Sequence, residues 1–160
     1  MSVQVPEVGS KAVDFALPDT ELKLRSLSEF KGKKIVLAFF PAALSPVCTR
    51  EMCAFRDHFD ELSRAGAEVI GISVDGPFAN KQFKDVHGIN FPLLSDYNRE
   101  VISRYGIVMR DLLHIKEYRA AKRSVFVLDR DGVVRYRWVS DNPLVEPNYE
   151  EIKQVIKSLP

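Results

Sequence analysis

The chain has 160 residues, of which 46% are hydrophobic and 28% are charged, and these values are typical of one globular domain spanning residues 1–160. A net charge of +1 gives no electrostatic reason to expect nucleic acid or a membrane as a partner. Two cysteines are too few for a disulfide scaffold, and an N-terminus without an apolar core is not typical of a signal peptide, so we expect a cytoplasmic protein.

The first part of the chain is predicted to form a hairpin, a capped turn and a buried strand. Residues 14–18 and 23–25 are short extended segments on either side of a turn that begins at Pro18. Residues 26–30 fit a single capped turn. Residues 34–40 are a continuous apolar run rich in branched and aromatic side chains, which indicates a strand buried on both faces.

Strands and helices then alternate to the C-terminus. In order, we expect a helix to about Arg64 that Gly66 ends, a strand at 68–75, a helix at 77–86, an edge segment at 91–94, a helix from Asp96 to about Tyr105, strands at 124–129 and 133–139, and a last helix that Asn148 caps. Residues 107–122 are basic and compatible with either a loop or a short helix. This order predicts an α/β fold with a central mixed β-sheet flanked by helices on both faces.

Cys48 is expected in the first turn of the helix that follows the buried strand. Ser45 and Pro46 together are a helix-start signal, a capping residue followed by one whose φ is preset. Unpaired N–H groups and the positive end of the helix dipole should lower the pKa of a thiol placed there. Because the thiolate is the nucleophilic form, this is a suitable position for a reactive sulfur.

The two cysteines fall on opposite sides of this helix. At about 100° per residue, Cys48 shares the side of Met52 and Phe55 that should face the sheet, and Cys53 lies on the polar side. Both could be small buried hydrophobic residues, since free cysteine is often buried. The helix start for Cys48 and the polar neighbours of Cys53 weaken that interpretation, and physical reasoning alone leaves a redox role and a packing role open.

The residues around Cys48 resemble a known active-site motif. Pro41-x-x-x-Ser45-x-x-Cys48 is similar to the peroxiredoxin motif Pro-x-x-x-(Thr/Ser)-x-x-Cys, and the continuation to Cys53 resembles the Q-type, or bacterioferritin-comigratory-protein, subgroup of the AhpC/TSA family. The likeness extends from Gly9 to the C-terminal helix. It implies a thioredoxin-like fold with the N-terminal extension that peroxiredoxins carry.

The resemblance implies a thiol-dependent peroxidase that reduces hydrogen peroxide and organic hydroperoxides. Cys48 would be the peroxidatic residue and Cys53 the resolving one, through an intramolecular Cys48–Cys53 disulfide that a thioredoxin-like protein reductant recycles. No metal or other cofactor is needed, because the weak O–O bond breaks once it is held and polarised. We expect a monomer or a weak homodimer.

The same resemblance assigns supporting roles around the sulfur. Ser45 would hydrogen-bond the peroxide, and Pro41 would shield the thiolate from water. Arg123 matches the arginine that the family places just before a strand, with Lys122 as the competing assignment. Glu51 matches a position that orients this arginine, although a carboxylate near a helix start is favourable for its own sake.

Three other functions fit the sequence less well. Zinc binding by Cys48, Cys53 and His58 would lack a fourth ligand and the usual C-x-x-C spacing. A thiol-disulfide oxidoreductase would usually carry C-x-x-C at this helix start, whereas four residues separate the cysteines here. Nothing in the sequence supports a chaperone-like role.

Overall fold

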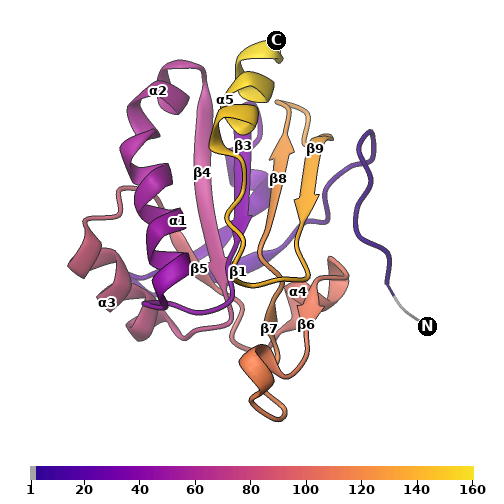
Figure 1. The fold of residues 1–160 in the computed structure, drawn as a ribbon. Coiled ribbons are helices and arrows are strands. Elements are labelled where there is room, and N and C mark those ends of the chain that lie inside the picture. The colour runs from indigo at the N-terminus through magenta and orange to yellow at the C-terminus, as the bar shows by residue number, and fades with distance from the viewer. Residues whose placement is uncertain (1–2) are drawn as a thin grey trace.

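The structure, a computed structural model that describes residues 3–160, is built on a five-stranded mixed sheet (Figure 1). The strand order is β5-β4-β3-β8-β9. Their bounds are Lys34–Phe39 for β3, Ala67–Ser73 for β4, Leu93–Ser95 for β5, Ser124–Leu128 for β8 and Val134–Val139 for β9. β3 pairs in parallel with β4 and antiparallel with β8, so the predicted mixed sheet is confirmed with β3 at its centre.

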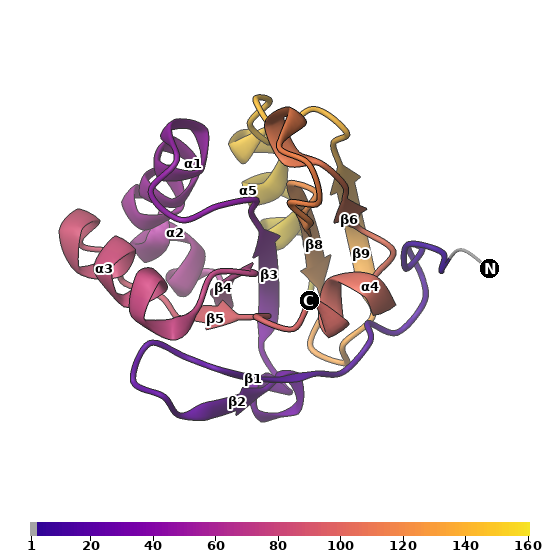
Figure 2. The ribbon, with the colours of Figure 1, turned by 90° about the horizontal axis from the view of Figure 1, so that it is seen from below.

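Helices cover both faces of the sheet (Figure 2). One face carries α1 (Pro46–Asp57), α2 (Phe59–Arg64) and α5 (Tyr149–Ser158), with α3 (Pro77–His87) toward the β5 edge. The other face carries α4 (Glu100–Arg104) and the antiparallel hairpin of β1 (Ala16–Pro18) and β2 (Leu24–Ser26), which leads into a 3₁₀ turn at Leu27–Phe30. The hairpin and this turn were both expected from the sequence.

Alternate residues of β3 supply two separate cores, which explains its continuous apolar run. Ile35, Leu37 and Phe39 pack with the hairpin and α4, whereas Val36 and Ala38 pack with α1, α2 and α5. All of these side chains are buried. A strand with both faces covered cannot alternate apolar and polar residues, so the fold requires the pattern that the sequence shows.

The helix expected to reach Arg64 is interrupted. α1 ends at Asp57, and α2 begins at Phe59 after a break at His58. The apolar spacing continues across this break, which is why the sequence predicted one helix. Residues 107–122 contain two short strands, β6 (Val108–Met109) and β7 (Ala120–Ala121), which pair antiparallel around a 3₁₀ turn at Leu112–His114. Within residues 3–160, no helix has the length and apolar character needed to cross a membrane.

The sheet register determines where the site forms. β3 leads through a short loop to the N-terminus of α1, and Phe39 near the end of β3 is paired with Ser124 at the start of β8. Because these strands are antiparallel, the residue before β8, Arg123, lies at the same end of the sheet as the loop before α1. Two segments 75 residues apart in the chain therefore meet there.

Candidate active site

Cys48 is the third residue of α1 and is completely buried. Pro46 occupies the first helical turn as predicted, and the N–H groups of this turn have no acceptor within the helix. Ser45 occupies the N-cap position, but its side chain does not cap the helix. Its Oγ instead donates a hydrogen bond to the carbonyl oxygen of Ala42 at 2.8 Å, which corrects the predicted capping role.

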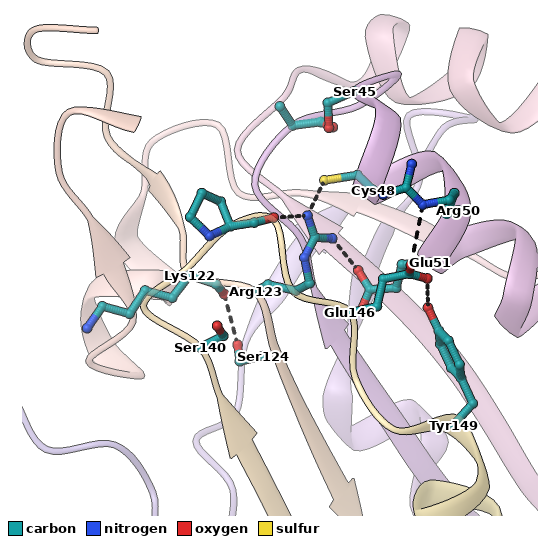
Figure 3. Close-up of polar contacts among 12 residues, drawn as sticks. Ser45, Cys48, Arg50, Glu51, Lys122, Arg123, Ser124, Ser140, Glu146 and Tyr149 are labelled. Atoms are coloured by element: carbon teal, nitrogen blue, oxygen red, sulfur yellow. Dashed lines mark hydrogen bonds and ion pairs between the residues drawn. The ribbon is translucent and has the colours of Figure 1, made fainter. Parts of the chain in front are cut away.

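Arg123 joins Cys48 to Glu51 inside the protein (Figure 3). Its Nη2 lies 3.2 Å from Cys48 Sγ, and its Nη1 donates to Glu51 Oε1 at 2.7 Å. The side chains of Arg123 and Glu51 are 1% and 0% exposed. A planar guanidinium with several donors can contact both groups at once, which the single ammonium of a lysine could not.

Lys122, the alternative cation, points away from this site. Its Nζ forms an ion pair with Asp141 at 2.8 Å, and Figure 3 shows its side chain directed away from Cys48. Adjacent residues of an extended chain face opposite sides, so only one of the two can reach the sulfur. The geometry therefore selects Arg123.

The electrostatic balance at Cys48 differs from the sequence expectation. Burial raises the pKa of the Cys48 thiol, and the charge of Arg123 and the Ser45 hydroxyl oppose this rise without overcoming it. The buried Glu51 carboxylate adds to the increase. The expected lowering was wrong for this closed form, because the sequence indicates a helix start and does not reveal complete burial beside a carboxylate.

The buried position of Glu51 disfavours the charged form of its carboxyl group. Burial raises the pKa of Glu51 to about 7, although the Arg123 guanidinium acts in the opposite direction. Among the residues that the structure describes, neither Glu51 Oε2 nor Arg123 Nε has a hydrogen-bond partner. A buried carboxylate with one unsatisfied oxygen binds a proton more readily than an exposed one.

A small pocket gives access to the sulfur. Its volume is about 100 Å³, and its wall is mostly apolar, with Cys48, Ser45 and Arg123 as the groups able to contact a substrate. The remaining lining residues are Pro41, Ala42, Pro46, Val47, Leu112, Leu113, Pro143 and Leu144. The pocket suits a small molecule that is held by a few polar contacts and shielded from water.

Cys53 is not part of this pocket. It lies half-buried in the same helix, and both cysteines are free thiols. Five residues of regular helix separate them by about 7.5 Å of rise and place them on different sides. Within residues 3–160, no three or more His, Cys, Asp and Glu side chains form a group that could hold a metal ion.

Sequence reasoning missed the segment between β9 and α5. The carbonyl oxygen of Pro143 accepts a hydrogen bond from Arg123 Nη2 at 2.7 Å. Glu146 Oε2 accepts from Arg50 Nε of α1 at 3.3 Å, and Glu146 Oε1 accepts from the Tyr149 hydroxyl at 2.7 Å. A backbone carbonyl leaves no mark in a sequence, and a lone glutamate in a loop is ordinarily a solvated charge.

Comparison with known proteins agrees with this geometry. Residues 8–137 match the AhpC/TSA family. The chain is 35% identical over 130 residues to peroxiredoxin Bcp of Escherichia coli, covering 81% of this chain and 83% of that protein. It is 43% identical over 128 residues to the chloroplastic peroxiredoxin Q of Oryza sativa subsp. japonica, covering 80% of this chain and 57% of that longer protein.

Comparison with solved structures identifies relatives in the same family. The crystal structure of peroxidoxin BcpB from Mycobacterium tuberculosis superposes with a TM-score of 0.85 at 31% identity, covering 96% of this chain and 97% of that one. The resemblance seen in the Pro41–Cys48 motif thus extends to most of the sequence and to the thioredoxin-like arrangement of the sheet. The chain therefore belongs to the AhpC/TSA family and is a thiol-dependent peroxidase of the peroxiredoxin type.

Proposed function

We propose that the protein reduces hydrogen peroxide and organic hydroperoxides with Cys48 as the peroxidatic residue and Cys53 as the resolving residue. The observation that carries this proposal is the 3.2 Å contact between Arg123 Nη2 and Cys48 Sγ at the wall of a small pocket. A cation that touches a sulfur favours the thiolate over the thiol. It also supplies a donor where negative charge develops on the peroxide oxygens.

In the first step the Cys48 thiolate attacks the terminal oxygen of the hydroperoxide. The S–O bond forms as the O–O bond breaks, so sulfur is oxidised to sulfenic acid and the peroxide is reduced. The departing hydroxide or alkoxide takes up a proton and leaves as water or an alcohol. The Cys48 N–H and the Arg123 guanidinium would donate to the two oxygens, and Ser45 Oγ, whose own proton is donated to the Ala42 carbonyl oxygen, would accept a hydrogen bond from the hydroperoxide.

Pro41 and Glu51 act indirectly. Pro41 lines the pocket and would keep bulk water from the thiolate. Glu51 holds the guanidinium through its 2.7 Å contact with Arg123 Nη1. We assign Glu51 as a positioning residue, because the pocket lining does not include it.

In the second step the Cys53 thiolate attacks the Cys48 sulfur. The S–S bond forms, the hydroxyl group leaves as water, and a disulfide results. In regular helix the Cα atoms would be roughly 8–9 Å apart, whereas a disulfide requires less than about 7 Å. The first turns of α1 must therefore unwind. The cycle then alternates between a folded, peroxide-reactive form and a locally unfolded disulfide form.

A thioredoxin-like dithiol protein would reduce the disulfide and restore both thiols. We further propose that the chain works as a single domain in the cytoplasm, as a monomer or weak homodimer. A reducing compartment is consistent with two free cysteines and a catalytic disulfide that forms only during turnover.

Peroxide consumption coupled to a thioredoxin system tests the two cysteine roles. Cys48→Ser should abolish consumption. Cys53→Ser should still consume one equivalent of peroxide per chain but lose sustained turnover, because its sulfenic acid has no internal partner. Turnover by Cys48→Ser, or full turnover with thioredoxin by Cys53→Ser, would contradict the assignment.

A further inference from the structure

The segment Pro143–Tyr149, which lies between β9 and the first residue of α5, contacts both Arg123 and the active-site helix α1 (Figure 3). Its first residue accepts a hydrogen bond from Arg123 through the Pro143 carbonyl oxygen at 2.7 Å. Its last residue, Tyr149, packs its ring edge-on against Phe55 of α1, with centroids 5.4 Å apart. We refer to residues 143–149 as the latch segment.

Glu146 contacts both α1 and the last residue of the latch segment. One of its carboxylate oxygens accepts from Arg50 Nε at 3.3 Å, and the other accepts from the Tyr149 hydroxyl at 2.7 Å. The Tyr149 contact is partly buried, whereas the Arg50 contact is exposed, because the side chains of Arg50 and Glu146 are 58% and 33% exposed. Burial and the Glu146 hydrogen bond raise the pKa of Tyr149, which therefore stays a donor at neutral pH.

The position of Arg50 gives these contacts a consequence for the reaction. Arg50 lies between Cys48 and Cys53, inside the stretch of α1 that must unwind before the disulfide can form. Unwinding this stretch breaks the Arg50–Glu146 contact and separates Phe55 from Tyr149. Each contact that exists only in the folded helix adds to the free-energy cost of opening it.

α2 is held independently, so opening can be confined to α1. The two helices are separated by the break at His58. Glu61 of α2 forms ion pairs with Lys153 and Lys157 of α5 at 3.3 and 2.6 Å, and Leu62 is buried against the sheet. None of these contacts involves the stretch between the cysteines.

We propose that the latch segment controls how fast oxidised Cys48 reaches Cys53, with Glu146 as its positioning residue. This inference rests on the proposed resolving role of Cys53. The Cys48 sulfenic acid has two fates. If α1 opens, Cys53 attacks the sulfur and water leaves; if α1 stays closed, a second hydroperoxide oxidises the sulfur to sulfinic acid and is itself reduced to water or an alcohol. Stronger contacts between the latch segment and α1 therefore favour oxidation to sulfinic acid.

The test is the partition between disulfide and sulfinic acid, measured by mass spectrometry of samples quenched during reaction with hydrogen peroxide. Glu146→Ala removes both carboxylate contacts, and Glu146→Gln keeps an acceptor for Tyr149 but loses the charge that pairs with Arg50. Glu150→Ala is the matched control, because Glu150 is an exposed neighbour that pairs with Lys153 of its own helix.

We expect disulfide formation to be about fivefold faster in Glu146→Ala, which corresponds to losing one hydrogen bond and one exposed ion pair. The sulfinic fraction should fall in proportion, Glu146→Gln should be intermediate, and Glu150→Ala should match the wild type. Amide exchange in the reduced protein should rise over residues 46–57 of Glu146→Ala and stay unchanged over residues 59–64, which a general loss of stability would not produce.

An unchanged partition in Glu146→Ala, or an equal change in Glu150→Ala, would overturn the latch while leaving the cysteine roles intact. A wild-type protein that consumes peroxide without forming the Cys48–Cys53 disulfide would overturn the resolving role of Cys53, and the latch with it.

Discussion

Arg123 contacts three groups with one guanidinium: Cys48 Sγ, Glu51 Oε1 and the Pro143 carbonyl oxygen. Arg123→Lys would keep the positive charge but could not maintain all three contacts, because an ammonium lacks the planar fork. We expect the rate of Cys48 oxidation by hydrogen peroxide to fall about 100-fold, the cost of losing an oriented donor to the developing charge. The change in the Cys48 pKa should be modest.

Stopped-flow measurement of the reaction between reduced protein and peroxide checks this expectation. The matched control is Lys122→Ala, which removes the adjacent cation that pairs with Asp141. It should react at the wild-type rate. Equal rates for Arg123→Lys and the wild type would show that charge alone, without the fork, is sufficient.

Glu51 makes the stability of the protein depend on pH. Its folded pKa of about 7 lies above the ordinary 4.5 because the carboxyl is buried. Its protonation therefore contributes stability that is fully present below about pH 4.5 and is lost as the pH rises through about 7. As the pH rises from about 4.5 to about 7, the free energy of unfolding of the wild type should fall relative to that of Glu51→Gln, because the glutamine cannot ionise.

Urea unfolding of both proteins at about pH 5 and about pH 8 measures this difference. Other titrating groups are common to the two proteins, so the change in the gap between their midpoints reports Glu51. A gap that does not depend on pH, or one that changes in the wild type's favour as the pH rises, would show that Glu51 is ionised throughout.

At the scale of elements, local sequence patterns were sufficient to predict strands that are buried on both faces and a helix that is capped by its own N-terminal side chain. The apolar runs of β3 and β8 and the Asn148 cap of α5 are of this kind. The break at His58 was missed because the apolar spacing from Met52 to Leu62 continues through it. Nothing local shows that α2 is instead fastened to α5 through Glu61.

Some residues of the site could likewise be predicted from local sequence, and others could not. Pro41, Ser45 and Cys48 lie close together in one short stretch of the sequence, so a motif can indicate them, whereas Arg123 was identified only through resemblance to a family. Glu146 carries no such mark, because its contacts with Arg50 and Tyr149 exist only after the chain has folded. The direction of the Cys48 pKa was missed for a similar reason. Burial and the proximity of Glu51 are properties of the packed protein, whereas a helix start is visible in the sequence.

At the scale of the whole molecule, α1 contributes to one of the two cores that the sheet separates. Cys48 and Met52 are completely buried in that core, and Phe55 is 1% exposed. The other core, formed with α4 and the hairpin, contains no residue of α1. Unwinding α1 should therefore weaken one side of the sheet and leave the other side packed.

This division predicts that the disulfide form is less stable than the reduced form, although disulfides usually stabilise. Closing so short a loop contributes only about 2 kcal/mol by restricting the unfolded chain. Exposing Met52 and Phe55 costs about 2 kcal/mol for each side chain, before the loss of helical hydrogen bonds is counted. The second effect is larger, so the oxidised protein should unfold at a lower urea concentration.

The dependence of its unfolding free energy on urea should also be shallower than for the reduced protein, because less surface remains to be exposed when α1 is already open. Urea titrations of the wild type, oxidised with one equivalent of peroxide or kept reduced, measure both quantities. Oxidised protein that is reduced again must regain the original midpoint, which excludes irreversible damage. An oxidised form as stable as the reduced one would mean that α1 stays packed around a Cys48–Cys53 bond. This result would contradict the unwinding of α1, because a regular helix holds the two Cα atoms too far apart for a disulfide.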